Sequence, residues 1–113
     1  MRLFAPDAAL DVTRGAGVAP QGRAAIRRFV QDWMAAYEEL EWMPEELLDV
    51  GNGVVFGVVS QQGRPVGVSG YVQQREAWVW VWVESLTLSL TTYPEADIDE
   101  ARAAAERLAE ERR

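Results

Sequence analysis

The sequence predicts one α+β domain, in which a curved antiparallel sheet packs on a helix and a second helix follows at the C-terminus. Residues 73–93 hold two alternating runs, one of tryptophan and valine at residues 78–83 and another at residues 86–93. Such a period of two in aromatic and β-branched residues is typical of β-strands. Residues 23–40 instead carry apolar side chains at helical spacing. The length of 113 residues suits a single domain, residues 1–113, with one hydrophobic core.

The strand at the centre of this prediction has two apolar faces. Trp78, Trp80 and Trp82 alternate with three valines. Successive strand side chains point to opposite faces, so the tryptophans share one face and the valines share the other. We therefore expect both faces to be covered, one by a helix or a ligand pocket and the other by a second subunit.

The N-terminal part of the chain predicts a short strand and a loop. Residues 8–13 alternate, with Leu10 and Val12 on one face and Asp11 on the other. The loop at residues 14–22 is rich in glycine. It lacks the lysine and serine of a phosphate-binding loop, so we interpret it as a plain connection.

The clearest helix is expected to begin at residue 22 or 23 and to end near residue 40. Its end is rich in acidic residues, including Glu38 and Glu39, although the helix dipole favours positive charge there. Its apolar stripe consists of Ile26, Phe29, Val30, Trp33, Tyr37 and Leu40.

The second half of the sequence predicts a meander of four strands. The turn at residues 51–53 indicates a tight hairpin, because Asn-Gly tolerates the positive φ angles of two-residue turns. Glu84-Ser85 marks another turn, and Pro94 ends the last strand. The strands are expected at residues 42–50, 54–61, 66–82 and 86–93.

A final helix is expected from about Ile98. Asp97 and Glu100 have the spacing of a capping box at its start. Ala101, Ala105 and Leu108 form only a thin apolar stripe. We therefore expect this helix to dock weakly or to belong partly to an interface.

The composition excludes several kinds of chemistry. With no cysteine, histidine or lysine, the chain lacks disulfides, thiolate metal sites, the usual general base and a Schiff-base amine. The net charge of −7 disfavours nucleic acid and anionic membranes, which bind basic surfaces. No apolar run has the length of a membrane-spanning helix, and no signal-peptide pattern is present. We expect a cytoplasmic protein without a metal, a cofactor, or a nucleic-acid or membrane partner.

Three segments in this order resemble SnoaL-like members of the nuclear transport factor 2 superfamily. They are LFAPDA at residues 3–8, GRAAIRRF at residues 22–29 and DVGNGVV at residues 49–55. The similarity continues through residues 69–70 to residues 93–94 and covers nearly the whole chain. The resemblance implies a cone-shaped α+β fold in which the sheet wraps on the helix.

The resemblance does not by itself assign a function. The superfamily includes ketosteroid isomerases, polyketide cyclases, limonene epoxide hydrolases and non-catalytic binding or dimerisation modules. Its members normally begin with a long helix that closes one side of the cone, and this sequence starts just before the segment that follows that helix. We therefore expect a pocket that is open, or one that the C-terminal helix or a partner subunit fills.

The positions that resemble the family's catalytic residues are changed in this chain. The isomerase-type base falls at Val12, which would line the pocket, with Asp11 as its neighbour. A shift of one residue turns a strand side chain to the opposite face, so Asp11 would point away unless a bulge turns it. The family's polar pocket residue on the long strand falls near Trp78, whose indole donates a hydrogen bond but no proton at neutral pH.

Aromatic residues are the candidate ligand contacts. If Trp33 and Tyr37 face Trp78 and Trp80, they form an aromatic box that suits a flat apolar ligand. Such a stripe is more often a core or a dimer interface, and that alternative stays open. Tyr71 would add a hydrogen bond to the pocket or pack at its edge.

Two carboxylates are the candidates for acid–base chemistry. Glu76 has the strand parity of Trp78, and burial against aromatic rings would raise its pKa and allow it to act as an acid or a base. Otherwise Glu76 is a solvated residue at a strand end. Asp11 either pairs with Arg14 at the pocket mouth or is a plain strand-end acid. Parity argues against Asp11 and Glu76 facing each other.

The first hypothesis for function is a homodimer that associates through its sheet and is non-catalytic or binds a small hydrophobic ligand in an aromatic pocket. The alternative is a small isomerase, cyclase or hydrolase. That enzyme would use Asp11 or Glu76 as acid or base and Tyr37 or Tyr71 as a hydrogen-bond donor.

Overall fold

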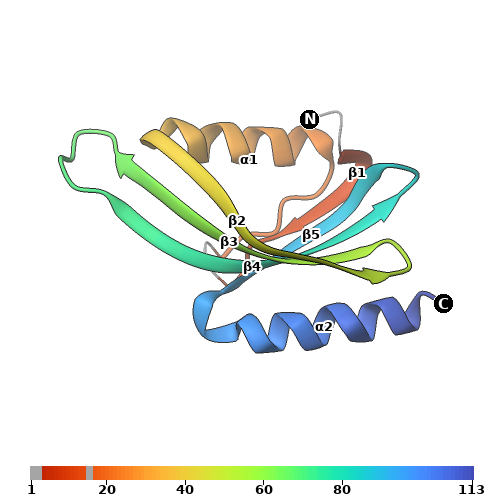
Figure 1. Ribbon diagram of the computed structural model, residues 1–113. Helices are drawn as coiled ribbons and strands as arrows, with labels where there is room; N and C mark the ends of the chain where they lie inside the picture. Colours follow the sequence, from red (N-terminus) through yellow and green to blue (C-terminus); the bar gives the residue numbers. More distant parts are fainter. Residues whose placement is uncertain (1–3, 15–16) are drawn as a thin grey trace.

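The computed structural model describes residues 4–14 and 17–113. The start of the chain at residues 1–3 and Gly15-Ala16 of the glycine-rich loop lie outside the described residues. The predicted α+β class and element order are confirmed (Figure 1). The elements are β1 (Phe4–Asp11), α1 (Arg23–Ala35), β2 (Tyr37–Gly51), β3 (Val54–Pro65), β4 (Val72–Val83), β5 (Leu86–Pro94), the 3-10 helix η1 (Glu95–Asp97) and α2 (Ile98–Glu111).

The five strands form one curved sheet in the order β1-β5-β4-β3-β2 (Figure 1). Strands β2 to β5 pair antiparallel, as the meander predicts. Strand β1 pairs parallel to β5, so the sheet is mixed and not wholly antiparallel. The helices α1 and α2 cover opposite faces of the sheet. Neither helix is long and apolar enough to span a membrane within the described chain.

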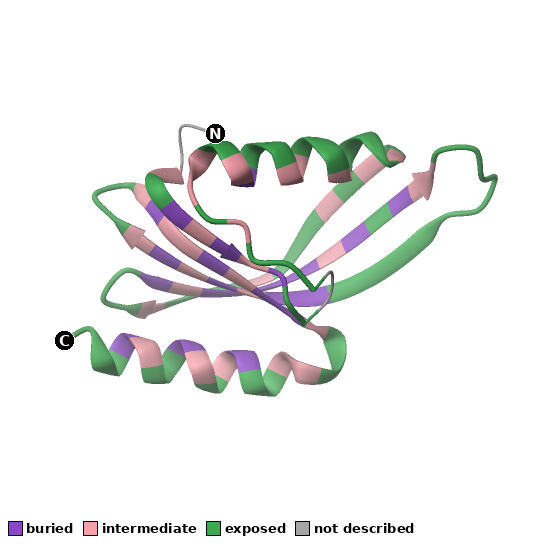
Figure 2. Ribbon diagram, turned by 180° about the vertical axis from the view of Figure 1, so that it is seen from behind, coloured by how far each residue is buried: buried purple, intermediate pink, exposed green. Residues whose placement is uncertain are grey.

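The alternation on β4, the middle strand, divides the core into two layers. Val79 and Val81 are each 4% exposed and pack with the buried alanines of α2. Trp78 and Trp80 pack on the other face, against a cluster that includes Ile26 of α1. Buried residues accordingly run along the middle of the sheet and along the facing side of α2, whereas α1 has one buried residue, Ile26 (Figure 2). The valine face is therefore covered by α2 of the same chain, whereas the sequence left open which face of the strand a second subunit would cover.

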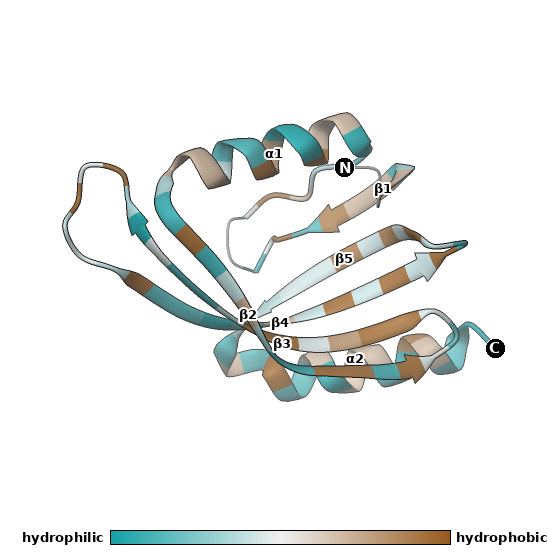
Figure 3. Cartoon of the chain, turned by 45° about the horizontal axis from the view of Figure 1, so that its top comes forward, coloured by the Kyte–Doolittle hydropathy of each residue, from teal (hydrophilic) through white to brown (hydrophobic). Residues whose placement is uncertain are grey.

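Helix α2 docks closely, although a weak contact was expected. Ala101, Ala105 and Ala109 are buried against the sheet, and their small side chains let the helix backbone approach it. The Asn52 amide donates a hydrogen bond to the Ala109 carbonyl at 2.6 Å, and the Arg112 guanidinium donates to the Asn52 carbonyl at 3.0 Å. The half of β3 along α2 is hydrophobic, and its other half is more polar (Figure 3). Packing and hydrogen bonds thus fix α2 at the β2–β3 hairpin.

The end of α1 differs from the prediction. The helix stops at Ala35, because Tyr37 already pairs with Pro65 of β3 and extends β2 backwards. Glu38 and Glu39 therefore belong to a strand, where Arg64 approaches them at 2.6 and 3.5 Å. The predicted conflict between these acids and a helix dipole is absent.

Two hairpin turns are formed as expected. Asn52 and Gly53 have φ angles of 57° and 79°, which confirms the predicted two-residue turn. Glu84 and Ser85 adopt φ angles of 52° and 71° without any glycine.

Other boundaries are shifted from the prediction. Strand β3 extends to Pro65 and residues 66–71 form a loop, so the strand expected at residues 66–82 begins at Val72. Strand β1 lies four residues earlier than expected at its start. Helix α2 begins at Ile98, but Asp97 makes no side-chain capping hydrogen bond, so the capping box does not form.

We predict that Ala105→Leu destabilises the fold by about 1–3 kcal/mol, because extra methyl groups at this closely packed position must push α2 from the sheet. The matched control is Ala103→Leu, on the exposed face of the same helix, which should change stability by less than about 0.5 kcal/mol. Urea unfolding followed by tryptophan fluorescence measures both variants. Equal stabilities would contradict the docked position of α2.

Candidate functional site

A cavity of about 540 Å³ lies between α1 and the tryptophan face of the sheet. Its lining comes from α1, β2, β4, β5 and the residue that follows β1. Four predicted site residues, Val12, Trp33, Tyr37 and Glu76, are brought together here. The full lining is Val12, Phe29, Asp32, Trp33, Tyr37, Gln74, Glu76 and Thr92.

Strand register explains why β4 contributes polar groups to this cavity. Gln74 and Glu76 precede Trp78 by four and two positions, so all three side chains share one face of the strand. Thr92 of β5 pairs with Trp78 across the ladder and therefore points the same way. Sequence reasoning identified Glu76 by its parity, but it did not identify Gln74 or Thr92. The strand face of Gln74 could have been predicted from its spacing to Trp78, whereas the position of Thr92 beside Trp78 depends on the β4–β5 register.

Aromatic rings form the wall of the cavity on the helix side. Phe29 and Trp33 lie one turn apart on α1, with ring centroids 6.0 Å apart. The ring of Trp33 also meets Trp42 of β2 edge-on at 6.1 Å. The indole N–H of Trp42 is satisfied by the Gln61 side-chain oxygen at 2.7 Å. The aromatic wall is therefore fixed by packing from two elements.

Gly63 of β3 allows Tyr37 to reach this wall. A Cβ atom at Gly63 would lie 3.1 Å from Cδ1 of Tyr37 and 2.9 Å from Cδ1 of Leu40. Both contacts are tighter than ordinary packing, so glycine lets these side chains cross over β3. This role of Gly63 was not predicted, because it depends on the pairing of β2 with β3.

Glu76 is the buried carboxylate of the cavity. The residue is 8% exposed, and its Oε1 accepts a hydrogen bond from the Trp78 indole N–H at 2.5 Å. Burial raises the pKa of Glu76, and hydrogen bonds from Trp78 and Gln74 partly oppose that rise. Within the described residues no arginine pairs with it. Glu76 is thus held in place by hydrogen bonds and not by a counter-ion.

Asp11 lies on the opposite face of the sheet. It pairs with Thr91, which in turn pairs with Val79 on the face that α2 covers. Its Oδ1 accepts hydrogen bonds from the Thr13 N–H at 3.0 Å and the Thr13 hydroxyl at 2.7 Å. These bonds lower the pKa of Asp11. Asp11 does not line the cavity, so it and Glu76 cannot act together on one bound molecule.

The remaining predicted residues do not line the cavity. Tyr71 is 55% exposed, and its hydroxyl donates to the Glu39 carboxylate at 2.5 Å. Trp78 and Trp80 are half-buried and meet edge to face, with centroids 5.2 Å apart. A Cβ at Gly57 would lie 2.9 Å from the Trp80 ring, so this ring lies across β3. Trp78 acts on the cavity through its hydrogen bond to Glu76.

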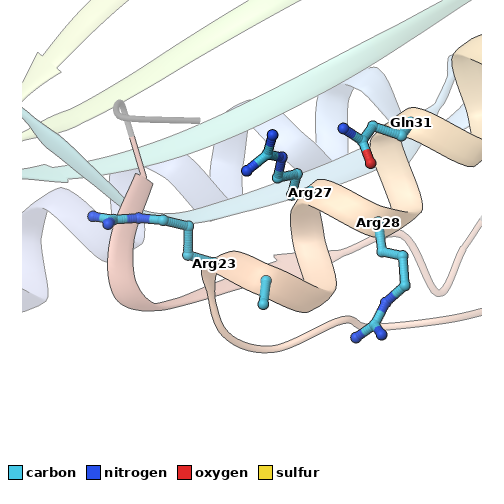
Figure 4. A pocket seen from close by; sticks show the side chains of 5 residues that line it. Arg23, Arg27, Arg28 and Gln31 are labelled. Atoms are coloured by element: carbon cyan, nitrogen blue, oxygen red, sulfur yellow. The ribbon is translucent and has the colours of Figure 1, made fainter.

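A second hollow of about 420 Å³ lies on the outer face of α1 (Figure 4). Arg23, Arg27 and Arg28 line it, and Arg27 and Arg28 point in different directions. Arg23 has a structural role, because its guanidinium donates to the Phe4 carbonyl at 3.0 and 2.8 Å. None of these three arginines is a lining residue of the cavity between α1 and the sheet. Across the described chain, no three acidic side chains come together as metal ligands would.

Comparisons with known proteins give the family. The model of the SnoaL-like domain family matches residues 1–88. The chain therefore belongs to the SnoaL-like family, as its sequence motifs suggested, and its fold is that of the nuclear transport factor 2 superfamily. No curated protein sequence matches the chain.

Solved structures of low sequence identity share the fold. A Catenulispora acidiphila protein of ketosteroid isomerase-like fold, in complex with trimethylamine, has a TM-score of 0.75 at 17% identity over 81% of this chain and 69% of its own. A Mycobacterium tuberculosis protein in complex with estradiol-17β-hemisuccinate has a TM-score of 0.69 at 18% identity over 86% and 79%. A computationally designed 17-OHP binder has a TM-score of 0.65 at 18% identity over 86% and 79%.

We predict that Glu76→Gln stabilises the protein at about pH 7.5, and that the gain disappears below about pH 4.5. The folded state raises the pKa of Glu76 above its ordinary value of 4.5. The stability of the wild type therefore declines as the pH rises from the pKa of the unfolded state to that of the folded state, and then levels off. Glutamine mimics the protonated carboxyl and keeps an oxygen for the Trp78 N–H.

Urea unfolding at both pH values measures this difference. Glu41→Gln, at an exposed position of β2, controls for the loss of one negative charge. A Glu76→Gln variant that is less stable than wild type at neutral pH would contradict the prediction.

Proposed function

We propose that this SnoaL-like chain is a binding module for a small, largely apolar molecule, which occupies the cavity between α1 and the sheet. The observation that carries this proposal is a cavity of about 540 Å³ that is walled by Phe29, Trp33 and Tyr37 and has the buried carboxylate of Glu76 at its side. Ligand cavities commonly have this size and combine apolar walls with a few polar groups that orient the ligand.

The ligands of the structural neighbours agree with such a role. The Mycobacterium tuberculosis protein holds a steroid ester, and the designed protein was made to bind 17-OHP. Both proteins are similar to this chain in fold, with TM-scores of 0.69 and 0.65. In the present chain the cavity between α1 and the sheet offers Trp33 and Glu76 as contacts for such a ligand.

Catalysis is the alternative function, and the environment of Glu76 favours it. A carboxylate with a raised pKa, next to apolar rings, can take a proton from a bound carbon acid and return it. Asp11 is on the other face of the sheet, so Glu76 would act alone as acid and base. Tyr37 lines the same cavity and would supply the hydrogen-bond donor.

Self-association through the sheet also belongs to the proposal, at a surface other than the valine face. Apolar side chains are exposed on the loop that joins β3 to β4 and on the strands beside it. We place the contact between two copies at this end of the sheet. The residues that carry it are Val66, Val68, Tyr71, Val72 and Met43, which are 57%, 52%, 55%, 43% and 64% exposed.

We predict that the neutral fluorescent probe N-phenyl-1-naphthylamine binds saturably to the cavity. Trp33→Leu should weaken this binding at least about tenfold, because one aromatic wall is lost. Tyr71→Leu, which alters an exposed ring outside the cavity lining, should leave the affinity within about twofold of wild type. A titration followed by probe emission measures all three proteins. Wild-type protein that binds no probe would refute the binding module.

For the catalytic alternative, the test reaction is the isomerisation of a β,γ-unsaturated ketone, followed by the absorbance of the conjugated product. Glu76→Gln should reduce the rate at least about a hundredfold if Glu76 transfers the proton. Asp11→Asn should not change it. If the wild-type protein binds the probe but does not catalyse the reaction, the binding module stands and the catalytic alternative is refuted.

We predict that Val68→Glu shifts self-associating protein towards monomer, because a charge replaces an apolar contact at the proposed interface. Sedimentation velocity at several protein concentrations measures the change. The control is Val18→Glu, at an apolar residue that is also exposed, by 43%, but that lies in the loop after β1. An unchanged distribution for Val68→Glu would place the interface elsewhere.

A further inference from the structure

We propose that the ligand of the cavity is an organic cation: a small amine or quaternary ammonium with an apolar body, whose positive nitrogen lies between Glu76 and the aromatic wall. This inference rests on the proposed binding function and specifies the chemical class of its ligand. It follows from the charge, burial and ring chemistry of the lining.

The cavity is negatively charged and has no positive side chain among its described residues. Its lining includes two carboxylates, Glu76 on β4 and Asp32 on α1, and none of the arginines that the structure describes. Other acids of the described chain do have arginine partners within 4 Å. These paired acids are Glu38, Glu39, Glu45, Glu46, Glu95, Glu100 and Glu110. Glu76 and Asp32 have no such partner within the described chain, so both carboxylates are available to a ligand.

Burial makes a positive ligand the natural partner of Glu76. A buried carboxylate is unfavourable unless a cation or several hydrogen bonds stabilise it. Glu76 is 8% exposed and receives an indole hydrogen bond from Trp78, but the described residues give it no cation. An ammonium group next to Glu76 would supply the missing positive charge and stabilise the ionised carboxylate.

The aromatic rings favour the same kind of ligand. Phe29, Trp33 and Tyr37 line the same cavity as the two carboxylates. Aromatic faces attract cations through their quadrupoles, and rings arranged around a cavity are a common means of binding quaternary ammonium groups. An anionic ligand would meet repulsion from both carboxylates. A neutral ligand would leave the Glu76 charge unused.

The size of the cavity and the charge of the whole chain agree with this class. A volume of about 540 Å³ is much larger than a simple ammonium ion needs, so the cation must carry an apolar body that fills the remaining space. The net charge of −7 attracts cations from solution and repels anions.

The experiment compares benzyltrimethylammonium with neopentylbenzene, its uncharged carbon isostere, by displacement of N-phenyl-1-naphthylamine at about pH 7.5. We expect the cation to bind at least about tenfold more tightly than the isostere. Glu76→Gln should remove most of this preference by weakening the cation at least about tenfold while changing the isostere by less than about twofold. Glu41→Gln removes the same charge at an exposed position outside the cavity and should preserve the preference.

Each outcome of this comparison supports or overturns the inference. If the isostere competes as well as the cation, or if Glu76→Gln leaves the preference unchanged, the ligand is not recognised as a cation. The binding module then stands, because the probe and the isostere still bind. If the wild-type protein binds neither the probe nor either competitor, the proposed function itself fails, and the inference fails with it.

Discussion

The alternation of tryptophan and valine along β4 is the constraint on which the rest of the structure depends. Strand β4 lies in the middle of the sheet, so the parity of its side chains decides what each face of the whole sheet can pack against. The narrow valines accept the alanine surface of α2, and the two layers close tightly. On the other face Trp78 and Trp80 pack with the cluster that includes Ile26 of α1, and Glu76 beyond them lines the cavity. A solid core and a cavity therefore lie on opposite sides of one strand.

The same parity places a charge where packing alone would not put one. Glu76 continues the tryptophan face by one step and becomes buried, with the indole of Trp78 as hydrogen-bond donor. Its raised pKa means that the folded state is less stable at neutral pH than it would be with a neutral side chain. Residues that reduce stability in this way are common where a protein binds or reacts with another molecule.

The sequence predicted the features that depend on local patterns. Alternation fixed the two faces of β4, helical spacing located α1, and Asn52-Gly53 identified a turn. Features that depend on pairing between distant residues were missed. The end of α1 is set by the ladder between Tyr37 and Pro65, and neither residue alone indicates it.

The lining of the cavity was predicted only in part. The residues that were missed also depend on pairing between distant parts of the chain. Val12, Trp33, Tyr37 and Glu76 line the cavity, because helix spacing and strand parity direct them there. Thr92 lines the cavity because of the β4–β5 register, which the sequence does not reveal. Tyr71 does not line it, because β4 begins at Val72 and not at Val66, so Tyr71 lies outside the strand. That α2 covers the valine face could not be predicted either, because nothing in an alanine-rich helix specifies the surface on which it docks.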